Sequence, residues 1–156
     1  MTPDETTNEH HTALRSWAKG IHTTVAATEL LICGFHGRFT ATEQPWIRHR
    51  SSHDGHFRGA WINFQNIPDH VGTLSSGERA YLLLAASIGS EQVKVNLSHE
   101  ISRLDREQLA LVLAALAHAA GSHQHSGVTF DPDGTPIGFT IKLPSLYPWP
   151  EPSETA

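Results

Sequence analysis

Histidine is the residue type in this 156-residue sequence with the most chemical potential, since there are twelve of them. Imidazole nitrogens bind zinc and similar metals, and they exchange protons near neutral pH. One group occupies the middle of the sequence and another follows residue 116, and the two could face each other in the fold: His36, His49, His53, His56 and His70, then His118, His123 and His125.

The most compact set of possible metal ligands is in the middle group. His49, His53, Asp54 and His56 could hold zinc or another divalent metal if their loop folds around the ion. This set supports a metal-dependent hydrolase as one hypothesis for the function. The alternative is that these side chains are exposed and polar in a loop rich in glycine and serine, in which case the protein needs no cofactor.

A second candidate site combines arginine with tryptophan between residues 38 and 64. Such side chains are favoured at protein interfaces because they give large contact area and planar hydrogen bonding. A tail rich in proline adds two more aromatic residues. The predicted partner-binding residues are Arg38, Trp46, Arg48, Arg50, Arg58, Trp61, Tyr147 and Trp149. We therefore expect an accessory or protein-interaction module, without catalytic residues, that binds a protein partner or itself. A nucleic-acid-binding regulator is the third hypothesis.

Charge and composition limit these hypotheses. The formal net charge of −5 argues against a general nucleic-acid binder with a dominant basic field. The longest apolar run, from Tyr81 to Ile88, is shorter than the roughly 20 residues that a membrane-spanning helix needs. The N-terminus is acidic and polar, and the only cysteine, Cys33, predicts no internal disulfide. We expect a cytoplasmic protein.

The elements that would position these residues suggest one α+β domain over residues 9–143. It would follow a flexible segment, 1–8, and precede a proline-rich tail, 144–156, that is extended, docked or disordered. Apolar residues at steps of three and four predict a long N-terminal helix, with Asn8 as its N-cap and a kink near Gly20. Trp17 lies on its buried stripe, and Cys33 adjoins the stripe, so we expect Cys33 to be a small core thiol.

Two further helices carry clear start signals. Ser75 precedes Glu78 by three residues, and Asp105 stands in the same relation to Gln108, so each pair predicts a capping box. We expect helices over 76–88 and from about 106 to 120. Residues 38–59 lack periodicity, which predicts a surface loop with one short strand. Residues 61–64 predict a strand, and residues 93–97 a strand or an extended linker. A hairpin is expected to join 128–130 to 137–141 through an Asp-Pro-Asp-Gly turn.

Three short motifs resemble those of known enzyme families. The segment from Leu74 to Arg79, with Leu104-Asp105-Arg106, resembles the signature and D-loop region of ABC-type ATPases; two capped helices account for the same residues, and no Gly-x-x-x-x-Gly-Lys loop is present. Residues 128–135 resemble the first motif of haloacid-dehalogenase-type phosphatases, which implies a nucleophilic Asp131; a hairpin turn needs the same residues. His53-Asp54 resembles the pair that names HD-type phosphohydrolases.

A longer resemblance covers residues 74–121. With Leu-Ser-Ser-Gly-Glu-Arg, Arg103-Leu104-Asp105 and the segment from His118 to Gly121, this region resembles small actinobacterial proteins, some of them from phages or plasmids. The resemblance implies a cytosolic or mobile-element system, and it implies no activity.

Overall fold

The predicted N-terminal helix is two helices. The structure, a computed structural model that describes residues 3–51 and 57–151, has α1 over Pro3–Ala18 and α2 over His22–Cys33. Gly20 lies between them with a φ of 100°, which a residue without a side chain adopts readily, and this confirms the predicted kink. The helix begins at Pro3 instead of Asn8, because proline and acidic residues suit a first helical turn. Residues 3–8, predicted to be flexible, are therefore helical.

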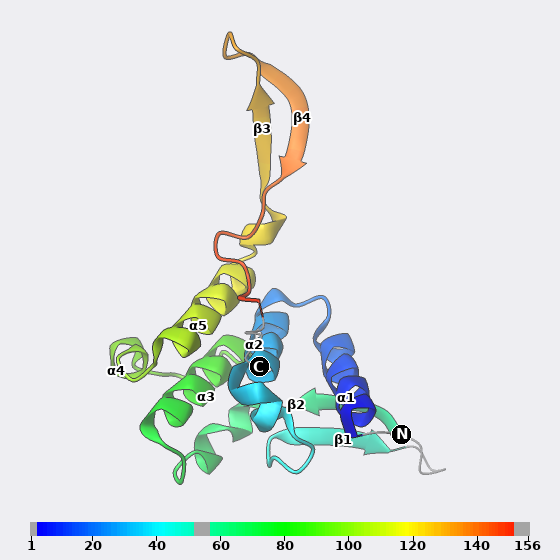
Figure 1. Ribbon diagram of the computed structural model, residues 1–156, viewed down its shortest axis with the longest axis vertical. Helices are drawn as coiled ribbons and strands as arrows, with labels where there is room; N and C mark the ends of the chain where they lie inside the picture. Colours follow the sequence, from blue (N-terminus) through cyan, green and yellow to red (C-terminus); the bar gives the residue numbers. More distant parts are fainter. Residues whose placement is uncertain (1–2, 52–56, 152–156) are drawn as a thin grey trace.

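The core is built around α2. This helix packs against α3 (Ser76–Gly89) and α5 (Arg106–Ala119), which lie beside it in Figure 1. Leu30 and Leu31 are fully buried, as is Tyr81 on α3. The Tyr81 hydroxyl donates a hydrogen bond of 2.5 Å to the carbonyl oxygen of Leu30, so this buried polar group is satisfied.

Both predicted capping boxes are present. Ser75 and Glu78 bond each other's backbone amides at the start of α3, and Asp105 and Gln108 do so at the start of α5. Of the two alternatives for residues 93–97, the strand is not formed, and residues 93–96 are a linker without regular structure. Asn96 instead caps a short helix, α4 (Leu97–Ile101), because its side chain accepts from the backbone amide of His99 and draws the chain into a helical turn.

The segment predicted as a surface loop contains a two-stranded antiparallel ribbon, β1 (Ile47–Ser51) and β2 (Phe57–Ile62). Ile47 pairs with Ile62, and both are buried against the core. The predicted strand at 61–64 is displaced, since β2 ends at Ile62. Short 3-10 segments flank the ribbon: η1 (Gly34–Thr40), η2 (Phe64–Asn66) and η3 (Pro68–His70).

The predicted hairpin is confirmed as β3 (Ser126–Phe130) and β4 (Pro136–Lys142). We call residues 126–142 the arm. A short segment, η4 (Ser122–Gln124), joins the arm to α5. The arm projects from the body of the molecule (Figure 1). In the described residues the two strands pair only with each other.

The proline-rich tail is docked as far as it is described. The backbone amide of Leu146 donates to the Ser122 hydroxyl at 3.2 Å, and Trp149 packs against the edge of the core. The whole arrangement, with helices and two small antiparallel sheets, is an α+β fold as predicted. No helix within residues 3–51 and 57–151 has the length and apolar character to cross a membrane.

Candidate functional site

Two of the predicted interface residues, Trp46 and Arg38, make their main contacts within the protein. Trp46 is 2% exposed, and its indole N–H donates to the carbonyl oxygen of Phe39 at 2.8 Å, so it is a core residue and not part of an exposed surface. Arg38 forms an ion pair with Glu78 and lies over the Phe39 ring, 4.5 Å from its centroid. The hydrogen bond from Arg38 lowers the pKa of Glu78. Arg38 therefore joins η1 to the start of α3.

The remaining arginine and tryptophan residues of the ribbon share one face. Arg48 pairs with Trp61 across the strands, and Arg50 pairs with Gly59. Because alternate residues of a strand point to the same side, Arg48, Arg50 and Trp61 lie together. Both arginines are exposed. The side chain of Arg58, the other predicted arginine, lies outside the described part of the chain.

This face borders a groove between α1 and β2, with a volume of about 690 Å³. The groove is lined by Ala13, Ser16 and Trp17 from α1 and by Arg50, Gly59, Ala60 and Trp61 from the ribbon. We call it the tryptophan groove. Small side chains and two indoles form most of its lining.

Trp17 is the residue of this site that the sequence analysis missed. The periodic pattern placed Trp17 on a buried stripe with Leu14, but its side chain is 41% exposed while Leu14 is fully buried. Both residues lie in α1, but Leu14 packs into the core, whereas Trp17, near the end of the helix, lines the groove beside β2. The apolar spacing alone could not separate the two, because the ribbon that forms the other wall of the groove is distant in sequence.

The tryptophan groove continues past the end of α1. A second hollow, of about 210 Å³, shares Trp17 and Trp61 with the first and extends to Asn63, Gln65 and Ser90. The two indoles therefore border both hollows, and the second adds the amide and hydroxyl groups of Asn63, Gln65 and Ser90 to the surface beside them.

The tail residues of the predicted interface lie elsewhere. Tyr147 is 40% exposed, and Trp149 packs near His118, with 6.4 Å between ring centroids. Trp149 thus helps to hold the tail against the end of α5, and the structure does not bring it together with Trp61.

Only one of the four predicted metal ligands can be placed. His49 lies on β1 and its Nε2 atom is 3.4 Å from the carbonyl oxygen of Thr42. His53, Asp54 and His56 lie outside the described residues. Within residues 3–51 and 57–151, no group of three or more histidine, cysteine, aspartate or glutamate side chains is arranged to hold a metal ion.

The two groups of histidines that were expected to face each other meet different partners in the described part of the chain. His49 lies near His10 of α1, with ring centroids 5.6 Å apart. His118 and His123 stack at 4.1 Å and meet His22, at the base of the arm. These contacts form between residues distant in sequence, so spacing along the chain could not reveal them.

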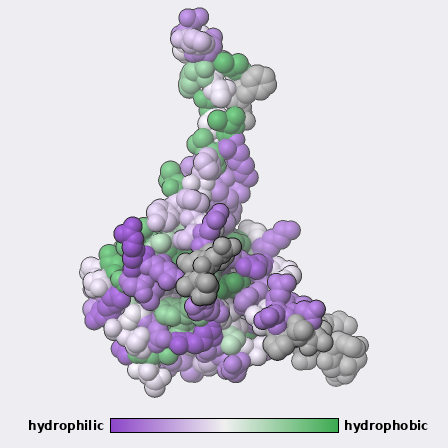
Figure 2. All heavy atoms as spheres, viewed as in Figure 1, coloured by the Kyte–Doolittle hydropathy of each residue, from purple (hydrophilic) through white to green (hydrophobic). Residues whose placement is uncertain are grey.

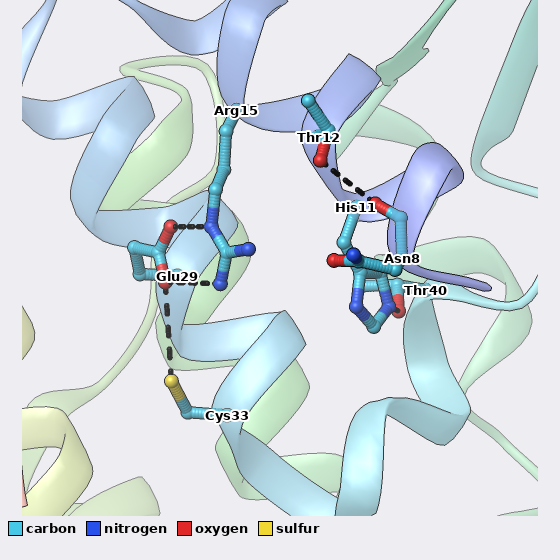
Figure 3. A network of polar contacts seen from close by, with 7 residues as sticks. All are labelled: Asn8, His11, Thr12, Arg15, Glu29, Cys33 and Thr40. Atoms are coloured by element: carbon cyan, nitrogen blue, oxygen red, sulfur yellow. Dashed lines mark hydrogen bonds and ion pairs between the residues drawn. The ribbon is translucent and has the colours of Figure 1, made fainter. Parts of the chain in front are cut away.

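His10 holds α1 to the core. Its ring is 8% exposed, and its Nε2–H donates to the carbonyl oxygen of Thr40 at 2.7 Å. The neighbouring His11 ring lies 2.9 Å from the Thr40 hydroxyl, a contact drawn in Figure 3. Desolvation lowers the pKa of His10 below its ordinary value; the hydrogen bond to Thr40 opposes this shift, and His49 adds to it.

The lowered pKa of His10 predicts that acid destabilises the fold. The unfolded chain takes up a proton near pH 6.5, whereas folded His10 stays neutral to a lower pH. The contribution of His10 to the free energy of unfolding should therefore be constant above about pH 6.5 and fall below it, by up to about 1.4 kcal/mol per pH unit, until folded His10 is also protonated. The pKa values of His11, His118 and His123 are also lowered and add to the total slope. Urea unfolding at a series of pH values measures this slope.

A matched pair of variants tests the assignment to His10. His10→Gln keeps a donor for the Thr40 carbonyl but removes the titrating ring, so its slope should be shallower. His125→Gln, at an exposed position, should keep the wild-type slope. Equal slopes for the two variants would show that His10 does not carry the effect.

Cys33 was expected to be a small core thiol, and this is wrong. It is the last residue of α2 and its side chain is exposed, because the buried face of the helix is set by Leu30 and Leu31. Figure 3 shows its sulfur beside Glu29, 3.9 Å from the carboxylate that Arg15 also binds. Desolvation and the Glu29 charge raise the pKa of the thiol, which keeps it protonated and weakly nucleophilic at neutral pH.

Comparisons of this chain with protein-family models, with curated proteins and with solved structures gave no match. The resemblance of residues 74–121 to small actinobacterial proteins stays a prediction. Any function must therefore be argued from the geometry of the molecule.

Proposed function

We propose that this chain is a protein-interaction module that binds its partner in the tryptophan groove. The observation that carries the proposal is the position of Trp17 and Trp61, two indoles that line one groove beside the guanidinium of Arg50. Trp17 is 41% exposed and Trp61 is partly buried, and two indoles that line one hollow are typical of a surface that a partner covers.

Energetics favour this surface over the rest of the predicted interface. Tryptophan and arginine dominate the residues whose truncation costs at least about 2 kcal/mol in protein complexes. They are effective where small neighbours let a partner side chain enter, and Ala13, Ser16 and Gly59 provide that space here. Arg38 and Trp46 bind other residues of the same chain, so they stabilise the fold and offer no contact area to a partner.

The lining also specifies the chemistry of the partner. The indole faces recognise an aromatic or aliphatic side chain, and Arg48 and Arg50 at the rim recognise a carboxylate beside it. These arginines are a local positive region on a chain with a net charge of −5. The segment that fits is therefore an apolar side chain next to aspartate or glutamate, on the surface of a partner molecule.

A short labelled peptide tests this function. The probe is a fluorescein-labelled peptide with one phenylalanine flanked by aspartates, and fluorescence anisotropy measures its affinity. We expect Trp61→Ala to weaken binding about 30-fold, since a residue of this kind contributes about 2 kcal/mol, and Arg50→Glu to weaken it at least about tenfold.

Two controls make the peptide result specific. Lys94→Glu changes the net charge as Arg50→Glu does, but at an exposed position away from the groove, and it should bind like the wild type. A peptide with lysine in place of aspartate should bind weakly to every variant. Equal affinity of the wild type, Trp61→Ala and Arg50→Glu for the acidic peptide would contradict the proposed function.

A further inference from the structure

The arm carries large apolar side chains that nothing in the described chain covers. Their exposed fractions lie between 46% and 61%: Val128, Phe130, Ile137 and Ile141. In Figure 2 the projecting arm shows apolar atoms at several heights. A two-stranded hairpin is marginally stable in water without packing on one of its faces. The arm is therefore a surface that gains stability when a partner covers it.

The tip of the arm is ordered and acidic. Asp131 accepts hydrogen bonds from the backbone amides of Asp133 and Thr135, at 3.0 and 2.8 Å, and these bonds hold the turn. Phe130 precedes the turn and is 61% exposed, while Asp133 is exposed at the turn itself. The tip thus presents an aromatic side chain next to a carboxylate.

This chemistry complements the tryptophan groove of the same sequence. The Phe130 ring suits the faces of Trp17 and Trp61, and aromatic pairs of this kind add to the energy of simple burial. The carboxylate of Asp133 suits Arg48 and Arg50 at the rim, because opposite charges that meet across an interface favour the encounter and fix its orientation.

The arm of one chain does not occupy its own groove. It leaves the body at the end of α5 and points away from it, whereas α1 and the β1–β2 ribbon lie at the other end of the molecule (Figure 1). We propose that the tip of the arm binds in the tryptophan groove of a second copy of this chain. This inference rests on the proposed function, since it names the occupant of the same groove.

Sedimentation velocity over a range of protein concentrations tests the occupant. Because a hairpin tip buries a small area, the contact belongs to the weak and transient class, and the average mass should rise with concentration. Arg50→Glu removes the groove and Phe130→Ser removes the tip, so each should weaken self-association at least about tenfold. A mixture of the two variants should associate, because one keeps an intact tip and the other an intact groove.

Two exposed positions supply matched controls. Lys94→Glu reverses a charge as Arg50→Glu does, and Leu146→Ser removes an exposed apolar side chain as Phe130→Ser does. Both positions lie away from the tip and the groove, so both variants should associate like the wild type. If Phe130→Ser alters the arm, as judged by circular dichroism, Asp133→Lys tests the tip in its place. It changes an exposed side chain and keeps the Asp131 carboxylate that holds the turn.

Three results would overturn the inference. The wild type could stay monomeric at all concentrations, or Arg50→Glu could associate like the wild type, which would mean that arms pair with each other. The mixture of variants could also fail to associate. A monomer that still binds the acidic peptide would overturn only the occupant and leave the proposed function standing. A monomer that does not bind the peptide would overturn both.

Discussion

Trp46→Ala is expected to destabilise the protein by about 3–5 kcal/mol, which is a large part of the stability of a domain of this size. The substitution removes a side chain that is 2% exposed and packs beside Phe39. It also leaves the carbonyl oxygen of Phe39 without the indole N–H that it accepts from. Urea unfolding followed by circular dichroism measures the change in the free energy of unfolding.

Trp61→Ala is the matched control for Trp46→Ala, since both positions were predicted to lie on one interface. Trp61 lines an open groove, so its truncation leaves no closed cavity and should cost less than about 1.5 kcal/mol. The two variants should thus separate: the first loses stability and the second loses binding. A similar loss of stability in both would contradict the division into core and surface.

Gly34→Ala is expected to destabilise the protein by about 3 kcal/mol through overpacking. A Cβ atom at this position would overlap the ring and hydroxyl of Tyr81, which is fully buried and bonded to Leu30. The backbone of Gly34, with a φ of −78° and a ψ of 145°, suits alanine, so the cost comes from packing and not from backbone strain. Thermal and urea unfolding measure it.

Gly72→Ala provides the control for this prediction. No heavy atom lies within 4 Å of a Cβ built at Gly72, so the change should stay within about 0.5 kcal/mol. If Gly34→Ala is as stable as Gly72→Ala, then Tyr81 does not occupy the space that the structure gives it, and the packing of α2 on α3 would need revision.

The sequence predicted those elements whose signals are local. Ser75 with Glu78 and Asp105 with Gln108 mark the starts of α3 and α5, because a capping box is complete within four residues. The turn at Asp131 is also local, and the hairpin around it was predicted. Gly20 marked the break between α1 and α2 for the same reason.

The candidate site depends on contacts between distant segments, and there the sequence was a weaker guide. Trp46 and Trp61 stand in one stretch without helical periodicity, so the sequence did not show that the first is buried in the core and the second lines a groove. The difference between them arises from Phe39, which receives Trp46, and from α1, which leaves a groove beside Trp61. Residue type alone suggested an interface, and only the pairing of β1 with β2 placed Arg48 beside Trp61.

The histidines show the same limit. Their number suggested a metal site in the middle of the sequence, but His10 and His22, which the sequence analysis left out of both groups, are the partners of His49 and His118. These pairs are set by the packing of α1 on the ribbon and of α2 on α5. No spacing rule within one segment contains that information.

The central claim is that a partner covers Trp17 and Trp61, and the four indole N–H signals of the protein test it most directly. We would record two-dimensional ¹H–¹⁵N spectra of the labelled protein while adding the acidic phenylalanine peptide, with Trp17→Phe and Trp61→Phe to assign the signals. The signals of Trp17 and Trp61 should shift with saturation, and that of Trp46, bonded to Phe39 within the core, should stay in place. Saturating shifts confined to Trp149, or no shifts at all, would contradict the account.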